Sequence, residues 1–409
     1  MTRVIHTGDT HLGYQQYHRP ERREDFLDAF QQVADDAVSD DVDAVVHAGD
    51  LFHDRRPTLP DIMGAMSVLR TLDDADVPFL AVVGNHESKR DAQWLDLFES
   101  MGLATRLGSS PVELGDVAFY GLDFVARAKR PDLAYDFDEH GADHAVLVSH
   151  GLFQPFPHGD WDAQEILAES NIEFDALLLG DNHKPQTQQV EDPHESWLTY
   201  CGSTERASAD ERDERGYNLV AFDGGIDIRR RGLDTREFVF VDVELVEGEG
   251  AERVRERVGQ YDLDDTVVVV SIEGAGDPIA PATIEEFADE RGALVARVTD
   301  HRELADEADI EVSFADPDDA VRERIRDLGL SAAAQDLDET IRASKVPDSK
   351  VADTIEDRVE GFVDEADDGA FQPADTTATE DEQAASADGD AADDGARSSD
   401  DQVTMEDYR

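Results

Sequence analysis

The chain has 409 residues, more than one ordinary hydrophobic core accommodates, so we expect two or three domains. Its 36 Lys and Arg residues stand against 97 Asp and Glu residues, which gives a formal net charge of −61. Self-repulsion at this density destabilises a compact state unless molar salt shortens the Debye length to about 3 Å. The composition therefore favours a halophilic protein from a salt-loaded cytoplasm over an acidic protein of a mesophile.

Short apolar runs alternate with helical patterns from residue 1 to about 235, which is typical of an α/β domain. The runs are rich in Val, Leu and Ala and predict buried strands at 3–7, 43–49, 78–84, 144–149 and 174–180. Apolar residues at spacings of three and four predict helices between them, around 26–37, 62–69 and 94–101. Strand-like runs between about 197 and 231 are expected to close a second sheet.

A second, smaller α/β unit is predicted from 236 to 315, which makes 1–235 the first domain. Its expected order is strand, helix (250–260), strand, helix (282–291) and two further strands, the last at 310–314. A helical segment follows over 316–365, which includes two short helices within 331–363 that are broken at Pro347. The remainder, 366–409, is acidic and nearly free of apolar residues, so we expect a disordered tail.

Neither secretion nor membrane insertion is indicated. The single cysteine, Cys201, allows no intrachain disulfide and favours a reducing compartment. The N-terminus enters a strand-like segment without an apolar signal stretch, and no apolar run approaches the ~20 residues that span a bilayer. We therefore expect a cytoplasmic protein without a membrane partner.

Side chains that commonly bind metals follow five of the predicted strands. They are Asp9 and His11, Asp50 and His53, Asn85 and His86, His150, and Asp181 and His183. Ligand sites in α/β sheets form at the carboxyl ends of strands, so these groups are expected to converge. A lone histidine such as His150 is more often a hydrogen-bonded structural residue. The complete set predicts one site, since burying unpaired Asp and His side chains is costly.

Mixed Asp, Asn and His ligation suits two moderately hard divalent ions such as Mn²⁺. Asp50 is central in the pattern and could bridge both ions with its two oxygens. Two such ions clamp the attacking and leaving oxygens of a phosphoryl displacement and lower the pKa of bound water. His86 follows the candidate ligand Asn85 and could donate a proton to the leaving oxygen. The pattern predicts a metal-dependent phosphodiesterase.

The motifs GDTHLG, GDLFHD, GNHE, SHG and GDNHK resemble the five signatures of calcineurin-like metallophosphoesterases. HLGYQQYHRPERREDF, the pair Phe52-His53 and YCGSTERAS at 200–208 narrow the resemblance to the DNA double-strand-break repair nucleases of the Mre-eleven (archaeal) and SbcD (bacterial) family. The resemblance is strong over about 1–235 and extends to 236–365 in domain order and length. It implies a sandwich of two mixed sheets flanked by helices, a small α/β capping domain and a C-terminal helical pair.

The resemblance also implies an activity and a ligand assignment. The activity is 3′–5′ exonuclease action on duplex DNA and endonuclease action on single strands, with two Mn²⁺ ions per chain. One ion would be held by Asp9, His11, Asp50 and His183, and the other by Asp50, Asn85, His150 and residue 181; the catalytic positions are His53 and His86. Asp181 stands where the family has histidine, so either direct ligation or a bridging water is expected there.

Three kinds of partner are implied. Helices at 60–72 and 91–101 are candidates for a homodimer interface, with ordinary core helices as the alternative. The helical pair at 331–363 matches the docking site of a coiled-coil ATPase of the Rad-fifty/SbcC type, unless it packs on the chain's own core. DNA is the third partner, and its candidate phosphate contacts are Arg19, Arg22, Arg23, Lys89, Arg90, Lys184 and Arg206, with a further group at Arg127, Lys129 and Arg130.

These cations could equally balance neighbouring acids, and counterion release contributes little at high salt. We therefore expect weak DNA binding by the isolated chain. Two other functions stay open at this point: a small-substrate phosphodiesterase or phosphatase of the same fold, and a scaffold subunit with an impaired metal site.

Overall fold

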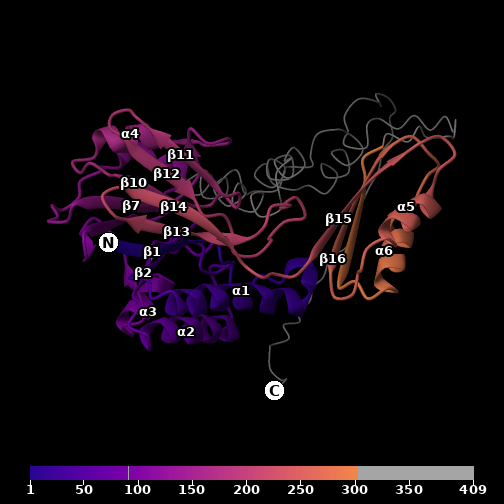
Figure 1. Cartoon of the computed structure of the whole chain (residues 1–409), viewed down its shortest axis with the longest axis horizontal. Coiled ribbons are helices and arrows are strands. Elements are labelled where there is room, and N and C mark those ends of the chain that lie inside the picture. Colours follow the sequence, from indigo (N-terminus) through magenta and orange to yellow (C-terminus); the bar gives the residue numbers. More distant parts are fainter. Residues whose placement is uncertain (91, 303–409) are drawn as a thin grey trace, which may run out of the picture. The chain divides into compact units, whose positions relative to one another are not determined.

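The computed structural model describes residues 1–90 and 92–302 (Figure 1). The expected strand at 310–314, the helical segment 316–365 and the acidic tail 366–409 lie outside the described residues. Within the described part, no helix has both the length and the apolarity that crossing a membrane requires.

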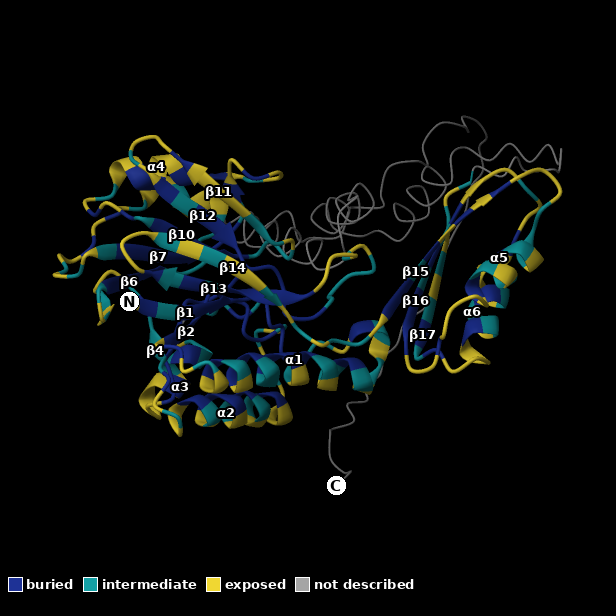
Figure 2. Ribbon diagram, in the orientation of Figure 1, coloured by how far each residue is buried: buried dark blue, intermediate teal, exposed yellow. Residues whose placement is uncertain are grey.

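The first sheet has six strands in the order β14-β13-β1-β2-β3-β4. Four of them are parallel: β1 (Thr2–Thr7), β2 (Ala44–His47), β3 (Phe79–Ala81) and β4 (Thr105–Arg106). The helices that connect them are α1 (Pro20–Ser39), α2 (Leu59–Asp73) and α3 (Trp94–Ser100). Parallel strands need such crossovers, and apolar side chains of the helices and the sheet form one continuous core. In Figure 2, α1 and α2 carry buried residues toward the sheet and exposed residues on the opposite side.

The second sheet also has six strands, in the order β11-β12-β10-β7-β6-β5. Its parallel centre is formed by β6 (Val117–Leu122), β7 (His144–His150), β10 (Ala176–Gly180) and β12 (Ser196–Tyr200). The antiparallel edges are β5 (Val112–Leu114) and β11 (Gln186–Val190). Both sheets contribute to a buried apolar layer in which Val4 and Val46 of the first meet Val146 and Leu178 of the second. The fold is therefore the expected sandwich of two mixed sheets flanked by helices.

The connections of the second sheet include short elements. They are the pair β8 (Phe153–Gln154) and β9 (Trp161–Asp162), the helix α4 (Ala163–Glu169) and the 3-10 helix η2 (Arg127–Asp132). A further 3-10 helix, η1 (Gln16–His18), precedes α1. Of these, α4 packs its apolar face on the second sheet through Ile166 and Leu167.

The five predicted buried strands are all present, but one prediction about the sheets was wrong. The strand-like runs at 197–231 were expected to close a second sheet together. Only β12 does so, whereas β13 (Gly216–Phe222) and β14 (Ile226–Gly232) return to the first sheet, where β13 pairs antiparallel with β1. The β13–β1 pairing joins residues more than 200 positions apart, and local sequence pattern carries no information about such a partner.

A separate three-stranded parallel sheet follows, with β15 (Phe238–Leu245), β16 (Val267–Gly274) and β17 (Val295–Asp300). The helices α5 (Ala251–Val258) and α6 (Pro281–Asp289) cover one face and share its apolar core. The expected order of elements is confirmed as far as β17. Placing the domain boundary at 235/236 stays a proposal; it is supported by the change of sheet between β14 and β15.

Candidate metal centre

Strand register places the carboxyl ends of two neighbouring parallel strands side by side in each of the two sheets. Thr7 of β1 lies beside His47 of β2, and Gly180 of β10 lies beside His150 of β7. The loops that follow β1 and β2 then run together, because the Asp9 N–H donates to the Gly49 carbonyl (3.0 Å). The His11 N–H donates in the same way to the Asp50 carbonyl (3.0 Å), so the two loops hold each other's candidate ligands in place.

The backbone at these positions is unusual. Asp9, His11, Asp50 and Asp181 have φ values of 49°, 42°, 56° and 86°, in the left-handed region that residues other than glycine seldom adopt. Gly49 also has a positive φ of 91°, and a Cβ there would lie 2.6 Å from the His150 ring. Local strain of this kind costs about 1–3 kcal/mol per residue and persists mainly at functional sites.

Seven of the predicted side chains form three overlapping groups, and in each group the potential ligand atoms lie within 4.8 Å of one another. The groups are Asp9/His11/His183, Asp9/Asp50/His150 and His11/His53/His86. Nε2 atoms of His11 and His183 are 3.0 Å apart. His150 Nε2 lies 3.3 Å from Asp50 Oδ2 and 2.8 Å from the amide oxygen of Asn85. The structure thus brings Asn85 to the second group as well.

Asp181 is the exception among the predicted ligands. Within the described residues its carboxylate belongs to none of the three groups. Its backbone N–H instead donates to both carboxylate oxygens of Asp9, at 3.0 and 3.2 Å. The fifth loop therefore contacts the centre through its main chain and through His183.

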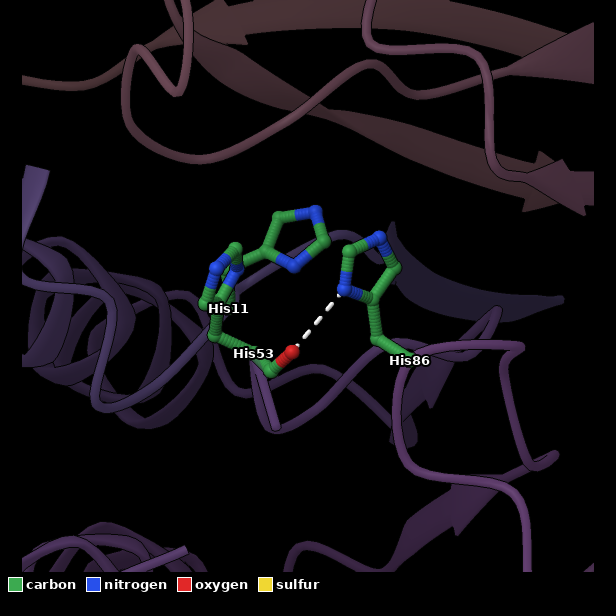
Figure 3. Close-up of side chains that lie close together, drawn as sticks. All are labelled: His11, His53 and His86. Atoms are coloured by element: carbon green, nitrogen blue, oxygen red, sulfur yellow. Dashed lines mark hydrogen bonds between the residues drawn. The ribbon is translucent and has the colours of Figure 1, made fainter. Parts of the chain in front are cut away.

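The two predicted catalytic histidines lie beside His11 (Figure 3). Ring centroids of His53 and His86 are 5.4 and 4.9 Å from that of His11. The His86 Nδ1–H donates to the His53 carbonyl (2.9 Å), and the His86 backbone N–H donates to Asp50 Oδ1 (3.0 Å). Tyr14 stacks on the His53 ring with a centroid distance of 3.8 Å. Both imidazoles are thereby fixed at the mouth of the ligand cluster.

Burial and neighbouring charges shift the pKa values of the groups in the site in opposite directions. Burial raises the pKa of Asp9 to about 6 against the pull of His150 and His183. Burial acts the same way on Asp50, but His150 and His86 outweigh it and hold the pKa of Asp50 below its usual range. For His183 burial acts downward, yet the adjoining Glu211 carboxylate raises its pKa to about 9. Carboxylate, amide and imidazole groups buried at this spacing fit divalent cations, whose charge would compensate Asp9 and Asp50.

Comparison with known proteins agrees with this geometry. Residues 2–227 match the family of calcineurin-like phosphoesterases, whose members bind divalent metal ions. A protein from Haloferax volcanii named DNA double-strand break repair protein Mre11 is 62% identical, over 91% of this chain and 85% of that relative. The chain belongs to the Mre11 family. Relatives of the same name from Halobacterium salinarum and Methanosarcina acetivorans are 56% and 42% identical, covering 94% and 89% of this chain and 100% and 61% of the relatives.

Two carboxylates at the Mre11-family centre were missed by the sequence reasoning. Glu87 is buried and accepts from the backbone N–H groups of Phe52 (3.0 Å) and Gly84 (3.4 Å), and burial raises its pKa to about 7. Its position directly after Asn85-His86 could have marked it. Glu211 accepts from His183 Nδ1–H at 2.7 Å. No sequence signal singles it out, because it lies in the acidic stretch ADERDE.

The basic residues predicted to contact phosphate are mostly occupied within the chain. The prediction for Arg22 was wrong: its side chain is fully buried and pairs with Asp25 (2.6 Å) and Glu205 (3.1 Å). The other predicted cations fall into two sets. The first set makes the following contacts: Arg19 with the Leu294 carbonyl, Arg23 with Asp61, Arg206 with the Glu211 carbonyl, Arg130 with Asp160, and Lys89 with the Trp94 ring. The second set is defined by exposure alone and consists of Arg90, Arg127, Lys129 and Lys184.

Proposed function

We propose that this chain is a metal-dependent DNA nuclease that processes double-strand breaks. The observation that carries the proposal is the convergence of eight Asp, Asn and His side chains from five strand ends. This arrangement occurs in a chain that is 62% and 56% identical to DNA double-strand break repair proteins. The finer activities we propose are 3′–5′ exonuclease action on duplexes and endonuclease action on single strands.

Two sets of side chains would hold the ions. We assign Asp9, His11, Asp50 and His183 to one divalent ion and Asp50, Asn85, His150 and Asp181 to the other, with Mn²⁺ as the ion in both. Asp181 is the weakest member, because the close contact it makes in the site is through its main chain. When bound, two such ions polarise the phosphate and lower the pKa of a water molecule.

The histidines at the mouth of the site would act on the phosphate ester. His86 Nδ1 donates its proton in a hydrogen bond to the His53 carbonyl, so Nε2 is the nitrogen that can exchange a proton with a substrate. His86 would there protonate the leaving oxygen as general acid. His53, held flat against Tyr14, would contact the phosphate and fix its orientation.

We further propose a homodimer that uses α2 and α3. These helices and the residues at their ends carry four of the exposed large apolar side chains in the described part: Leu59, Met63, Leu97 and Met101. Their exposed fractions run from 39% to 67%. Contiguous exposed apolar surface marks interaction sites, and the proposed dimer would bury these four side chains. We propose that the ATPase partner binds to residues 331–363, which lie outside the described residues. We also propose that the isolated chain binds DNA weakly. We place the protein in the cytoplasm.

The function is tested with the full chain, a labelled duplex and Mn²⁺ or Mg²⁺ in molar KCl, with and without the ATPase. His150→Ala should abolish cleavage. His144→Ala is a matched control, because it removes the same residue type from the opposite end of the same strand β7. Cleavage of bis(p-nitrophenyl) phosphate but not of DNA would favour the small-substrate enzyme. Absence of metal binding by the wild-type chain would favour the scaffold.

A further inference from the structure

We propose that Glu211 is a positioning residue for His183 and that it sets the affinity of one metal site. The inference rests on the proposed function, in which His183 is a metal ligand. Glu211 Oε1 lies 2.7 Å from His183 Nδ1. A carboxylate can only accept in this bond, so Nδ1 keeps its proton, and Nε2 is the nitrogen that would give its lone pair to a metal ion after losing its own proton. That Nε2 faces the Nε2 of His11 at 3.0 Å, across the space a shared cation would use.

Glu211 is itself held in one orientation. Its second oxygen, Oε2, accepts from Arg215 Nη1 (3.0 Å), the Ala207 backbone N–H (3.1 Å) and the Ser203 hydroxyl (3.4 Å). The Glu211 side chain is 13% exposed and the Arg215 side chain 1%. Because both oxygens are engaged in a mostly buried position, the carboxylate cannot swing away from His183 without breaking four hydrogen bonds.

Arg215 fixes the same histidine from the main-chain side. Its Nη1 donates to the His183 carbonyl (3.1 Å), while Nε and Nη2 donate to the Asp213 carbonyl (3.0 and 2.8 Å). The ring and the backbone of His183 are thus anchored to one ion pair, Glu211–Arg215. Acidic residues are abundant in this loop, but among them Glu211 is the one placed to orient the ligand.

The other candidate histidine ligands are supported differently. His150 Nδ1–H donates to the neutral carbonyl of Ala48 (2.7 Å), and in the described structure the buried His11 Nδ1 has no hydrogen-bond partner. A carboxylate behind the ring raises the basicity of an imidazole ligand more than a carbonyl does, and loss of such partners typically costs about 10- to 100-fold in metal affinity. The effect of Glu211 should therefore fall on one of the two ions.

The test compares Mn²⁺ binding by the full chain and by Glu211→Gln, measured by calorimetry and by the loss of free Mn²⁺ signal in electron paramagnetic resonance. The amide would turn an NH₂ group toward one set of donors, so we expect one Mn²⁺ to bind about 10- to 100-fold more weakly and the other to be unchanged. Glu214→Gln is the matched control, with the same chemical change on an exposed residue three positions away, and should bind both ions as the wild type does.

Activity provides a second reading. In Glu211→Gln the Mn²⁺ concentration for half-maximal cleavage should rise, while kcat at saturating Mn²⁺ and KM for DNA stay near their wild-type values. If the Gln variant does not fold, Glu211→Asp decides, and an affinity between wild type and the expected Gln value supports the proposal. Wild-type affinity for both ions in either folded variant overturns it. Inactivity of the wild type on DNA would refute the proposed function alone, because the binding measurement does not depend on it.

Discussion

Replacing Arg22 by methionine should destabilise the fold strongly, although arginine on a helix is often taken for a solvent-exposed or DNA-contacting residue. The side chain is fully buried, and its guanidinium bonds Asp25, Glu205, the Gln16 amide oxygen (3.0 Å) and the Arg206 carbonyl (2.9 Å). Asp25 keeps a second partner in Arg236 (2.6 and 2.8 Å). Glu205 is only 1% exposed and would lose its cation, which puts the expected cost at about 3–5 kcal/mol.

The dependence on pH follows from Glu205. Burial raises the pKa of Glu205 even with Arg22 in place, and Arg22 opposes that rise. Removing Arg22 should raise the pKa further. A carboxyl group whose pKa is higher in the folded state than in the unfolded state favours folding when it is protonated. This contribution to stability is complete below the unfolded pKa of about 4.3 and is lost as the pH rises through the folded pKa. The destabilisation by Arg22→Met should therefore be larger at pH 8 than at pH 5.

The assay is urea unfolding in molar KCl. Arg229→Met is the control, because the Arg229–Asp227 pair has a similar distance (2.7 Å) but side chains that are 77% and 57% exposed, and it should cost less than about 1 kcal/mol. The double variant Arg22→Met/Glu205→Gln should recover much of the loss. The reasoning is refuted if Arg22→Met costs no more than Arg229→Met, or if Glu205→Gln fails to reduce its cost.

Three further predictions concern the site and the assembly. The pKa of His183 is about 9 in the metal-free chain, so the side chain is charged at neutral pH and Mn²⁺ must displace a proton from it. Mn²⁺ affinity should therefore rise from pH 6 to pH 9. Calorimetry in buffers of different ionisation enthalpy should detect the released proton, and Mn²⁺ binding without proton release would contradict this prediction. Asp181→Ala should weaken the second Mn²⁺ site, and unchanged affinity would remove Asp181 from the ligand set. Met63→Glu should convert a dimer to a monomer by light scattering, whereas Val246→Glu, equally exposed on the small α/β unit, should not.

The sequence was sufficient to predict the buried strands and the ligands that follow them, because both depend on a local residue pattern. An apolar run followed by Gly-Asp or Gly-Asn-His predicts both a buried strand and a ligand at its carboxyl end. Four stretches have this pattern, and a fifth apolar run is followed by His150, so together they predicted the centre. The return of β13 and β14 to the first sheet depends on pairing across 200 residues, which such patterns do not encode.

The roles of individual charged residues were the second feature that the sequence did not predict. With 97 acidic residues, sequence alone could not distinguish Glu205, the buried partner of Arg22, or Glu211, the partner of His183, from acids that only face solvent. The buried state of Arg22 was equally invisible, since it lies in a run of charged residues, RPERRED, at the start of α1. Burial and pairing of charges depend on tertiary packing, so the roles of Arg22, Glu205 and Glu211 could be assigned only from the structure.

The most direct test of the account is Mn²⁺-dependent cleavage of a labelled DNA duplex by the wild-type chain and by Asp50→Asn in molar KCl. Asp50 is buried among His11, His150 and the His86 backbone N–H, so its carboxylate is central to both proposed ion sites. We predict Mn²⁺-dependent cleavage by the wild type, loss of that cleavage on chelation, and background activity for Asp50→Asn with its fold intact. Cleavage by Asp50→Asn at the wild-type rate, or wild-type cleavage that survives chelation, would contradict a metal-dependent nuclease at this centre.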